Sequence, residues 1–326
     1  MVLLRKIITC ISLFTLTLSC GKSADEVAES RMVSVEKLLT DGNCSEALSK
    51  INSFPARPED ARYVKLKASA YACKADYTTA SLITDLKDLF SAGVSANFIS
   101  SLTTMSLAQT NDGPINSSYT NLYTAIEALL FSGDTATTEN PTASNRIADF
   151  NTTEADEINS YLFYLLLTEM GKYFYYYGDT DNTGAKGGKG NHLCLMSYDN
   201  VGNIAAILGA GATGSCTATG QSGSPDLRAS AAASINVNRA CQGIVLFNNF
   251  YDTFPNIALG SLSGVDLSSL QTVLDTGFTT LLSVGGLTDS SIVDMRSVEL
   301  CESQFATNTD DIQIYFANVF ETLHSL

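Results

Sequence analysis

The sequence predicts an all-α fold of helical hairpins, arranged as a repeat-like α-solenoid or a helical bundle, with one long glycine-rich loop inserted. Apolar residues recur at helical spacing through most of the chain, as in the stripe of Ala28, Met32, Val35 and Leu39. No stretch shows the strict alternation of apolar and polar residues that is typical of a half-buried strand. Residues 178–225 break the helical pattern and hold 11 of the 23 glycines.

The first 19 residues are organised like a secretory signal peptide. Arg5 and Lys6 form a short basic head, and a mostly apolar run follows over residues 7–18. This run is too short to span a bilayer as a helix, which needs about 20 residues. A basic head followed by a short apolar region is typical of an export signal. We therefore expect residues 1–19 to direct export and to be removed.

The stretch TLSCGKS resembles a bacterial lipobox. Ser19 is the small residue before the acceptor Cys20, and Thr17 stands where the motif usually has leucine. The resemblance implies that Cys20 becomes N-terminal and carries a diacylglyceryl thioether and an amide-linked chain such as palmitate. Two or more chains anchor a protein stably, whereas a single chain does so only marginally. Residues 20–31 would then be a lipidated polar tether. An ordinary cleaved signal and an uncleaved anchor are the alternatives.

The remaining chain, 32–326, is expected to form one helical domain. Its parts are a helical-repeat region at 32–177, the glycine-rich loop at 178–225 and C-terminal helices at 226–326. The whole chain carries a formal net charge of −15, and removal of Arg5 and Lys6 changes this to −17. A body this acidic repels nucleic-acid phosphates and anionic headgroups. We therefore expect no nucleic-acid partner, and membrane attachment through lipid alone.

Stripes of apolar residues predict helices over 24–41 and 44–53, and two more helices between residues 61 and 90, interrupted near Lys74–Asp76. Here the stretch AYACKADYTTA resembles the turn of a tetratricopeptide repeat. The matching residues are Ala70, Tyr71, Asp76, Tyr77 and Ala80, with Ala75 in place of the usual glycine. Upstream, DGNCSEAL matches the same turn at Gly42, Asn43, Glu46 and Ala47. The separation of Ala47 and Ala80 is 33 residues, against a family period of 34. The resemblance covers about residues 30–92, and a generic helical hairpin is the alternative.

Eight cysteines are present, of which Cys10 would leave with the signal and Cys20 would take lipid. An even number of six remains in an exported chain, where an oxidising compartment favours disulfides. Six cysteines allow 15 pairings, and spacing alone does not choose among them. The repeat resemblance implies one pair, Cys44–Cys73, because antiparallel stacking would bring the start of one helix to the end of the next. Two buried free thiols are the alternative there.

Two further bridges are hypotheses from position. A Cys194–Cys216 bridge would close part of the glycine-rich segment, and a Cys241–Cys301 bridge would join two C-terminal helices. The helices expected in this half of the chain cover residues 227–250, 266–283, 289–304 and 310–324.

The helix predicted from residue 152 has Thr152 and Thr153 as candidate N-caps and contains the aromatic stretch 161–177. A helix that is apolar on all sides is usually buried in the core. A second interpretation is that Tyr161, Phe163, Tyr164 and Phe174 line a cavity for an apolar ligand. Glu169 and Lys172 interrupt the stretch and argue against a membrane span.

The glycine-rich segment contains a weak calcium candidate. Asp179, Asp181 and Thr183 alternate as in the opening of an EF-hand loop, but Gly190 stands where the bidentate glutamate is expected. A polar turn that ends the helix is the favoured interpretation. GAKGGKGN does not have the spacing of a phosphate-binding loop, and His192 beside Cys194 does not make a metal site. No cofactor or metal is expected.

No enzyme is expected either, because the two histidines, His192 and His324, lie outside any recognisable catalytic pattern. The sequence predicts an envelope lipoprotein that acts as a helical-repeat scaffold or adaptor for protein partners. The alternative is a lipoprotein that binds a small apolar ligand or lipid, akin to the helical-repeat subunits of periplasmic import systems, and a structural envelope protein is a third. Gly21 and Lys22 after Cys20 suggest the outer membrane, with the body facing the periplasm.

Overall fold

The computed structural model describes residues 24–77, 84, 98–109, 113, 116–190, 192–198, 223–228, 235–257, 275 and 286–324. These residues fold into helices and connecting turns, with no strand among them beyond two isolated bridges, Cys194–Gly223 and Arg228–Ile235. This confirms the predicted all-α class. The expected helix at 266–283 lies outside the described residues, apart from one position. In the described part of the chain, no helix has both the length and the apolar character needed to cross a membrane.

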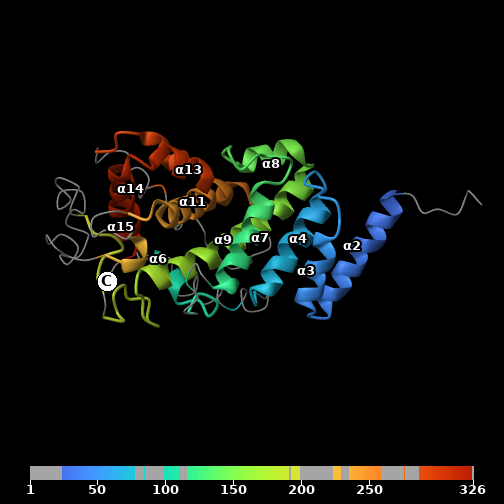
Figure 1. Cartoon of the computed structure of the whole chain (residues 1–326), viewed down its shortest axis with the longest axis horizontal. Helices are drawn as coiled ribbons and strands as arrows, with labels where there is room; N and C mark the ends of the chain where they lie inside the picture. The colour runs from blue at the N-terminus through green and yellow to red at the C-terminus, as the bar shows by residue number, and fades with distance from the viewer. Residues whose placement is uncertain are drawn as a thin grey trace, which may run out of the picture.

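Three consecutive helices form one end of the elongated molecule (Figure 1): α2 (Ala24–Thr40), α3 (Cys44–Asn52) and α4 (Ala61–Lys74). Gly42 adopts φ +72° between α2 and α3, in the left-handed region that glycine enters without strain. α2 begins at Ala24, so this helix occupies part of the stretch predicted as tether. Asp25 and Glu26 in its first turn favour that early start by offsetting the helix dipole.

α4 packs against α7 (Ser117–Leu130), which in turn packs against the central helix α9 (Thr152–Tyr177). The short helices α6 (Phe98–Thr103) and α8 (Ala143–Asp149) also contact α9. The second helix of the predicted second repeat would lie at 78–92, almost wholly outside the described residues. The tetratricopeptide-like interpretation therefore stays a prediction.

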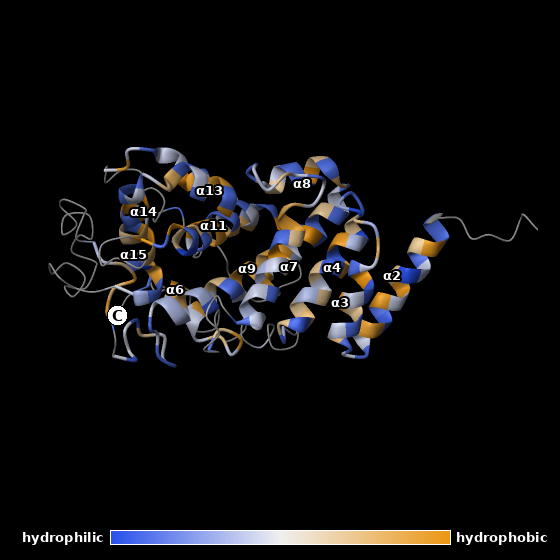
Figure 2. Ribbon diagram, in the orientation of Figure 1, coloured by the Kyte–Doolittle hydropathy of each residue, from blue (hydrophilic) through white to orange (hydrophobic). Residues whose placement is uncertain are grey.

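The central helix α9 (Thr152–Tyr177) is 26 residues long and is buried along most of its length. Its N-cap is Asn151, whose side-chain oxygen accepts a hydrogen bond from the Glu154 amide at 3.0 Å. The expected caps Thr152 and Thr153 instead lie inside the first turn of α9. The N-cap is the residue just before the helix, and its side-chain oxygen accepts from the amide two or three residues ahead, as Asn151 does. Figure 2 shows hydrophobic residues along α7 and α9 in the middle of the molecule.

The C-terminal helices form the opposite end of the molecule from α2 (Figure 1). They are α11 (Val237–Thr253), α13 (Val298–Phe305), α14 (Thr309–Tyr315) and α15 (Glu321–Leu323), with a π-helical turn η5 (Phe316–Phe320) before the last. Short 3-10 turns are η1 (Pro225–Leu227), η2 (Phe254–Asn256) and η4 (Ser290–Asp294). α11 starts ten residues later than predicted, where Asn236 accepts from the Arg239 amide. α13 starts later than predicted as well, where Ser297 caps it.

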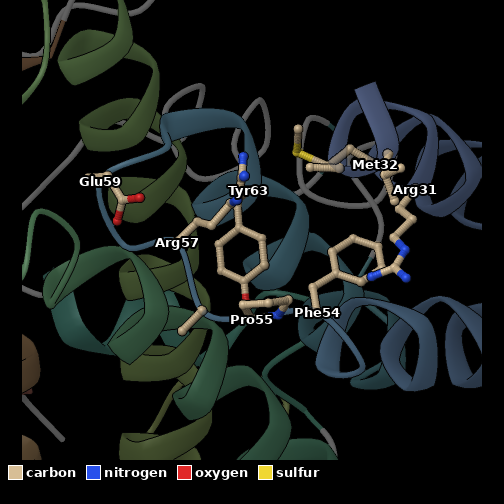
Figure 3. Close-up of a pocket in the computed structure, with 10 residues that line it drawn as sticks. Arg31, Met32, Phe54, Pro55, Arg57, Glu59 and Tyr63 are labelled. Carbon is tan, nitrogen blue, oxygen red and sulfur yellow. The ribbon is translucent and has the colours of Figure 1, made fainter. Parts of the chain in front are cut away.

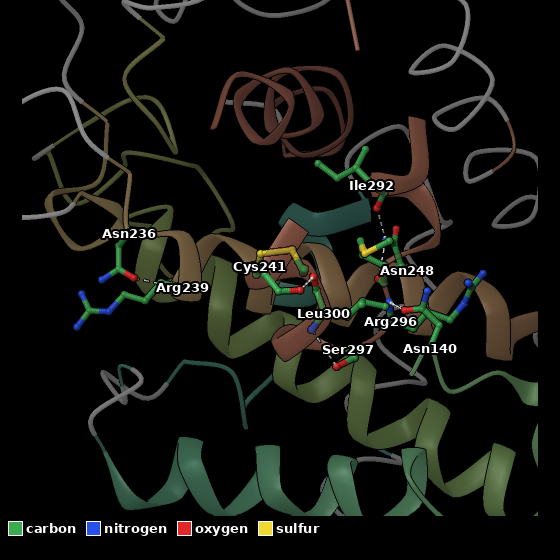
Figure 4. The surroundings of a disulfide bond; sticks show 12 residues. Asn140, Asn236, Arg239, Cys241, Asn248, Ile292, Arg296, Ser297 and Leu300 are labelled. Atoms are coloured by element: carbon green, nitrogen blue, oxygen red, sulfur yellow. Dashed lines mark hydrogen bonds between the residues drawn. A yellow bond between two sulfur atoms is a disulfide. The ribbon is translucent and has the colours of Figure 1, made fainter. Parts of the chain in front are cut away.

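Two disulfides each join a pair of helices. The helices of the first pair are consecutive in the chain, and those of the second pair are not. Cys44–Cys73 links the start of α3 to the end of α4 with a Cα separation of 5.4 Å. Cys241–Cys301 links α11 to α13 with a Cα separation of 5.8 Å (Figure 4). Both predicted pairings are present, whereas Cys216 lies outside the described residues and the Cys194–Cys216 bridge stays a prediction. The chain-entropy model gives a stabilisation of about 4 kcal/mol for each loop closed.

The two disulfides differ in burial, and this predicts the order in which they are reduced. Cys44 and Cys73 are only half-buried, whereas Cys241 and Cys301 are completely buried. A thiol reductant must reach sulfur to attack it, so Cys44–Cys73 should open first in the native protein. Alkylation at rising reductant concentration, followed by peptide mapping, would measure the order. In denaturant both bridges should open together, and earlier opening of Cys241–Cys301 in the native state would contradict the arrangement.

Glu169 is a fully buried carboxyl group in the middle of α9. Within the described part of the chain, neither of its carboxylate oxygens has a hydrogen-bond partner. Burial raises the pKa of Glu169 well above its ordinary value of 4.5, and the charge of Lys172 one turn further on only partly opposes this. Folding therefore takes up a proton at this residue when the pH lies between the ordinary and the raised pKa.

The Glu169→Gln substitution should remove this proton uptake. For the native protein, stability should fall as pH rises from about 4.5 through the raised pKa, by up to about 1.4 kcal/mol per pH unit. The glutamine resembles the neutral acid, so the variant should lack this component and equal or exceed the native stability at neutral pH. Urea unfolding of both proteins between pH 5 and 8 would measure how the free energy of unfolding of each depends on pH. If the two proteins showed the same dependence, Glu169 would not have a raised pKa.

Candidate functional site

A groove of two adjoining pockets lies on the N-terminal half of the molecule, across α2, α4 and α7. The first pocket, of about 420 Å³, lies between α2 and α4 and is shown in Figure 3. The second, of about 260 Å³, lies between α4 and α7. The two share Ala56 and Tyr63, so they are neighbouring parts of one surface, which we call the α2–α7 groove.

The chain between α3 and α4 forms the middle of the groove. Pro55 and Pro58 restrict this short connection, SFPARPED, to extended or turn conformations. Asp60 ends it as the N-cap of α4, where its carboxylate accepts hydrogen bonds from the Arg62 and Tyr63 amides, both at 3.0 Å. Two residues before Asp60, the carbonyl oxygen of Pro58 accepts a hydrogen bond from the amide of Gly133, which ties the connection to the residues after α7.

Apolar and aromatic side chains line the first pocket. α2 contributes Val27, Ala28 and Met32, and the rings of Phe54 and Tyr63 come from the connection and from α4 (Figure 3). Phe54 is half-buried, and the guanidinium of Arg31 lies 5.6 Å from the centre of its ring. Tyr63 is only 4% exposed and lines both pockets. Burial raises the pKa of its hydroxyl, so the ring stays neutral. This lining suits apolar side chains from outside.

Ion pairs connect α2 to the start of α4, and of their members Arg57 lines the first pocket. Arg57 lies 3.4 Å from the Asp25 carboxylate and 3.8 Å from that of Asp60. Arg62, one residue before Tyr63, contacts Glu29 and lies 2.8 Å from Glu36. The hydrogen bonds to Glu36 and Glu29 raise the pKa of Arg62, so its charge is permanent. The guanidinium group of each arginine thus pairs with two carboxylates. Together these ion pairs connect α2 to the start of α4.

The second pocket combines aromatic rings with one carboxyl group and one amine. α4 contributes Lys67 and Tyr71, while α7 contributes Glu127 and Phe131 at its end. Burial raises the pKa of Glu127 above its ordinary value. The pocket can therefore accept a second apolar group beside a polar edge.

The aromatic residues proposed for a ligand cavity lie in the core. Phe163 stacks on Phe250 at 5.3 Å between ring centres, and Phe174 meets Phe320 edge-on at 4.8 Å. Both rings are completely buried, while Tyr161 and Tyr164 are half-buried against the core. Phe163 and Phe174 are thus occupied with packing against other helices, as expected for a core helix.

The calcium candidate forms a compact polar turn at the end of α9. One carboxylate oxygen of Asp181 accepts hydrogen bonds from the Thr183 amide and hydroxyl, at 2.8 and 2.7 Å, and from the Ala185 amide at 3.1 Å. These bonds from Thr183 lower the pKa of Asp181. Asp179 next to it adopts φ +48° and is nearly buried. Among the described residues, no group of three or more His, Cys, Asp and Glu is placed to hold a metal ion.

The two histidines lie near the end of α9, far along the chain from the groove. His192 donates to the carbonyl oxygen of Tyr177 at 2.8 Å. His324 is completely buried beside Thr180, and burial together with the charge of Lys186 lowers its pKa well below the ordinary value. Its imidazole is therefore neutral at physiological pH. Cys20, the predicted lipidation site, lies outside the described residues.

Comparison of the chain with models of protein families, with curated proteins and with solved structures found no match. The α2–α7 groove was not expected from the sequence. A local signal in the sequence is the aromatic and proline-containing connection SFPARPED between the helices expected at 44–53 and from residue 61.

Proposed function

We propose that the protein is a lipoprotein of the bacterial cell envelope, anchored through Cys20, that acts as a scaffold or adaptor for a protein partner. In this proposal the lipid lies in the outer membrane and the helical body faces the periplasm. The α2–α7 groove is the observation that carries the adaptor role, because its two pockets are lined by apolar and aromatic side chains. Such side chains are enriched at the centre of protein interfaces.

The position of the groove relative to the anchor supports this role. α2 begins at Ala24, only four residues after Cys20. Four extended residues span at most about 14 Å, so the start of α2 would stay close to the membrane. The first pocket includes Val27 and Ala28 from the first turns of this helix. A partner bound in the groove would therefore be held near the membrane surface.

The anchor can be tested by intact-mass analysis of the protein purified from membranes. We expect a chain that starts at Cys20 and carries the mass of a diacylglyceryl group and a third acyl chain. The Cys20→Ala variant should lose this mass and leave the membrane fraction, because anionic headgroups repel a chain with a formal net charge of −15. Native protein that keeps its leader and an unmodified Cys20 would contradict the anchor.

The adaptor role can be tested by site-specific photo-crosslinking in intact cells. A photoreactive side chain at Ala56, which is exposed and belongs to both pockets, should give one discrete protein adduct. The same group at the exposed residue Glu139, which lines neither pocket, is the matched control and should give none. Absence of an adduct from Ala56, or the same adducts from both positions, would contradict a partner in the groove.

A further inference from the structure

The Cys44–Cys73 disulfide lines a third surface pocket, of about 350 Å³, at the N-terminal end of the molecule. This pocket lies between the turn that precedes α3 and the turn that follows α4. Both of its cysteines are half-buried, whereas Cys241 and Cys301 are completely buried. A small thiol can therefore reach the first bridge in the folded protein, and such access is a requirement for thiol–disulfide exchange.

The two sulfur atoms of this bridge belong to opposite ends of two helices. Cys44 is the first residue of α3, and its N-cap Asn43 forms no side-chain capping hydrogen bond within the described part of the chain. Cys73 is the last residue but one of α4. The partial positive charge at a helix N-terminus stabilises a thiolate, and the partial negative charge at a C-terminus destabilises one. The Cys44 sulfur is therefore the better leaving group.

The charged side chains that line this pocket are one amine and two carboxylates. Lys74 donates from Nζ to the Ser45 hydroxyl at 2.7 Å, which links α4 to α3 beside the bridge. The carboxylates belong to Glu46 and Asp76. Because both cysteines line the pocket that these three groups share, we attribute the difference between the sulfurs to the helix ends rather than to side-chain charge.

We propose that Cys44–Cys73 is a site of thiol–disulfide exchange, at which a dithiol reductant bonds first to Cys73 while Cys44 leaves as the thiolate. In the first step the incoming thiolate forms an S–S bond to the Cys73 sulfur, and the electron pair of the broken bond goes to the Cys44 sulfur. In the second step the other thiolate of the reductant attacks the reductant's own sulfur in the mixed disulfide and releases the Cys73 thiolate. The dithiol is thereby oxidised to a disulfide, and the two cysteines gain two electrons and take up two protons.

Reduction at this site would loosen the N-terminal helices. α3 has only nine residues, of which Ala47 and Ile51 are buried. An isolated helix shorter than about 12 residues is marginal in water, so α3 depends on its attachment to α4. α3 also packs against α2, which contributes Val27 and Met32 to the first pocket of the α2–α7 groove. The oxidation state of the bridge would therefore control how firmly α2 is held at that pocket.

The direction of attack can be tested by mapping mixed disulfides in the native full-length protein. The protein is treated with the neutral monothiol mercaptoethanol at neutral pH, and free thiols are trapped with excess N-ethylmaleimide before digestion. We expect mercaptoethanol on Cys73 and maleimide on Cys44 about threefold more often than the reverse, while Cys241–Cys301 stays closed as the internal control. An equal or reversed distribution would overturn the directed attack. Adducts that form first at Cys241 or Cys301 would overturn the exchange site itself.

Two substitutions on α3 and its cap test the cause of the direction. Asn43→Asp places a carboxylate at the N-terminus of the helix, which should destabilise the Cys44 thiolate and bring the ratio of the two adducts to about one. The matched change Ser49→Asp, on the same helix but outside the pocket, should leave the ratio unchanged. Both positions are exposed, so circular dichroism of each variant should match that of the native protein. Equal effects of the two changes would remove the helix-end explanation.

Two reductants distinguish the possible sources of the dithiol. Dithiothreitol represents a small molecule, and reduced thioredoxin represents a protein with two neighbouring cysteines. The reductant that opens Cys44–Cys73 faster per thiolate identifies the source, and both should open this bridge before Cys241–Cys301. If neither reductant opened Cys44–Cys73 in the folded protein, the exchange proposal would be wrong.

The effect on the fold can be measured by amide hydrogen exchange before and after selective reduction. Amides of α3 should exchange at least about tenfold faster in the reduced protein, because the closed loop no longer restrains the helix. Exchange in α11 should not change, since Cys241–Cys301 remains intact. Unchanged exchange in α3 would overturn the control of the N-terminal helices by this bridge.

Discussion

The burial of α9 on all sides from Leu165 to Tyr175 is the constraint on which the rest of the structure depends. Helices from both halves of the chain, including α6, α7 and α11, pack against it, so its side chains belong to one continuous core. Several polar groups carried into this core form hydrogen bonds across helices, whereas the Glu169 carboxylate has no such partner among the described residues. The Tyr173 hydroxyl donates to the carbonyl oxygen of Arg239 at 2.9 Å, and Arg146 donates to Asn159 at 2.6 Å. These bonds fix how neighbouring segments are oriented on α9.

Outside this core, covalent and ionic links hold the peripheral segments. The carboxylate of Glu321 near the C-terminus contacts buried Lys186 and accepts from the Leu195 amide and the Tyr198 hydroxyl, both at 2.7 Å. It therefore ties parts of the glycine-rich segment to the last helix. Removing one partner of such a buried pair leaves an uncompensated charge, which is far more costly than losing a surface pair. At the other end, Cys44–Cys73 and the arginine pairs keep α2 and α3 aligned with α4, and this alignment creates the α2–α7 groove.

Features set by local sequence could be predicted, and features set by distant contacts could not. The helix at 152–177 follows from its apolar periodicity, and Cys44–Cys73 follows from the resemblance of two turns. By contrast, Lys186 and Glu321 are 135 residues apart, and no spacing rule relates them. The groove likewise depends on packing, because its lining comes from α2, the α3–α4 connection, α4 and α7. The late start of α11 was missed because residues 227–236 are as compatible with a helix by composition as those that follow.

The most direct test of the central role of α9 is amide hydrogen exchange of the intact protein, followed by mass spectrometry. We expect the α9 amides from Leu165 to Tyr175 to exchange slowest, at the rate set by global unfolding, because this part of the helix is buried on every side and no local opening exposes it. Amides of α2, whose main contacts among the described helices are with α3 and α4, should exchange faster through local opening. Exchange in α9 that is as fast as exchange in α2 would contradict a structure organised around this helix.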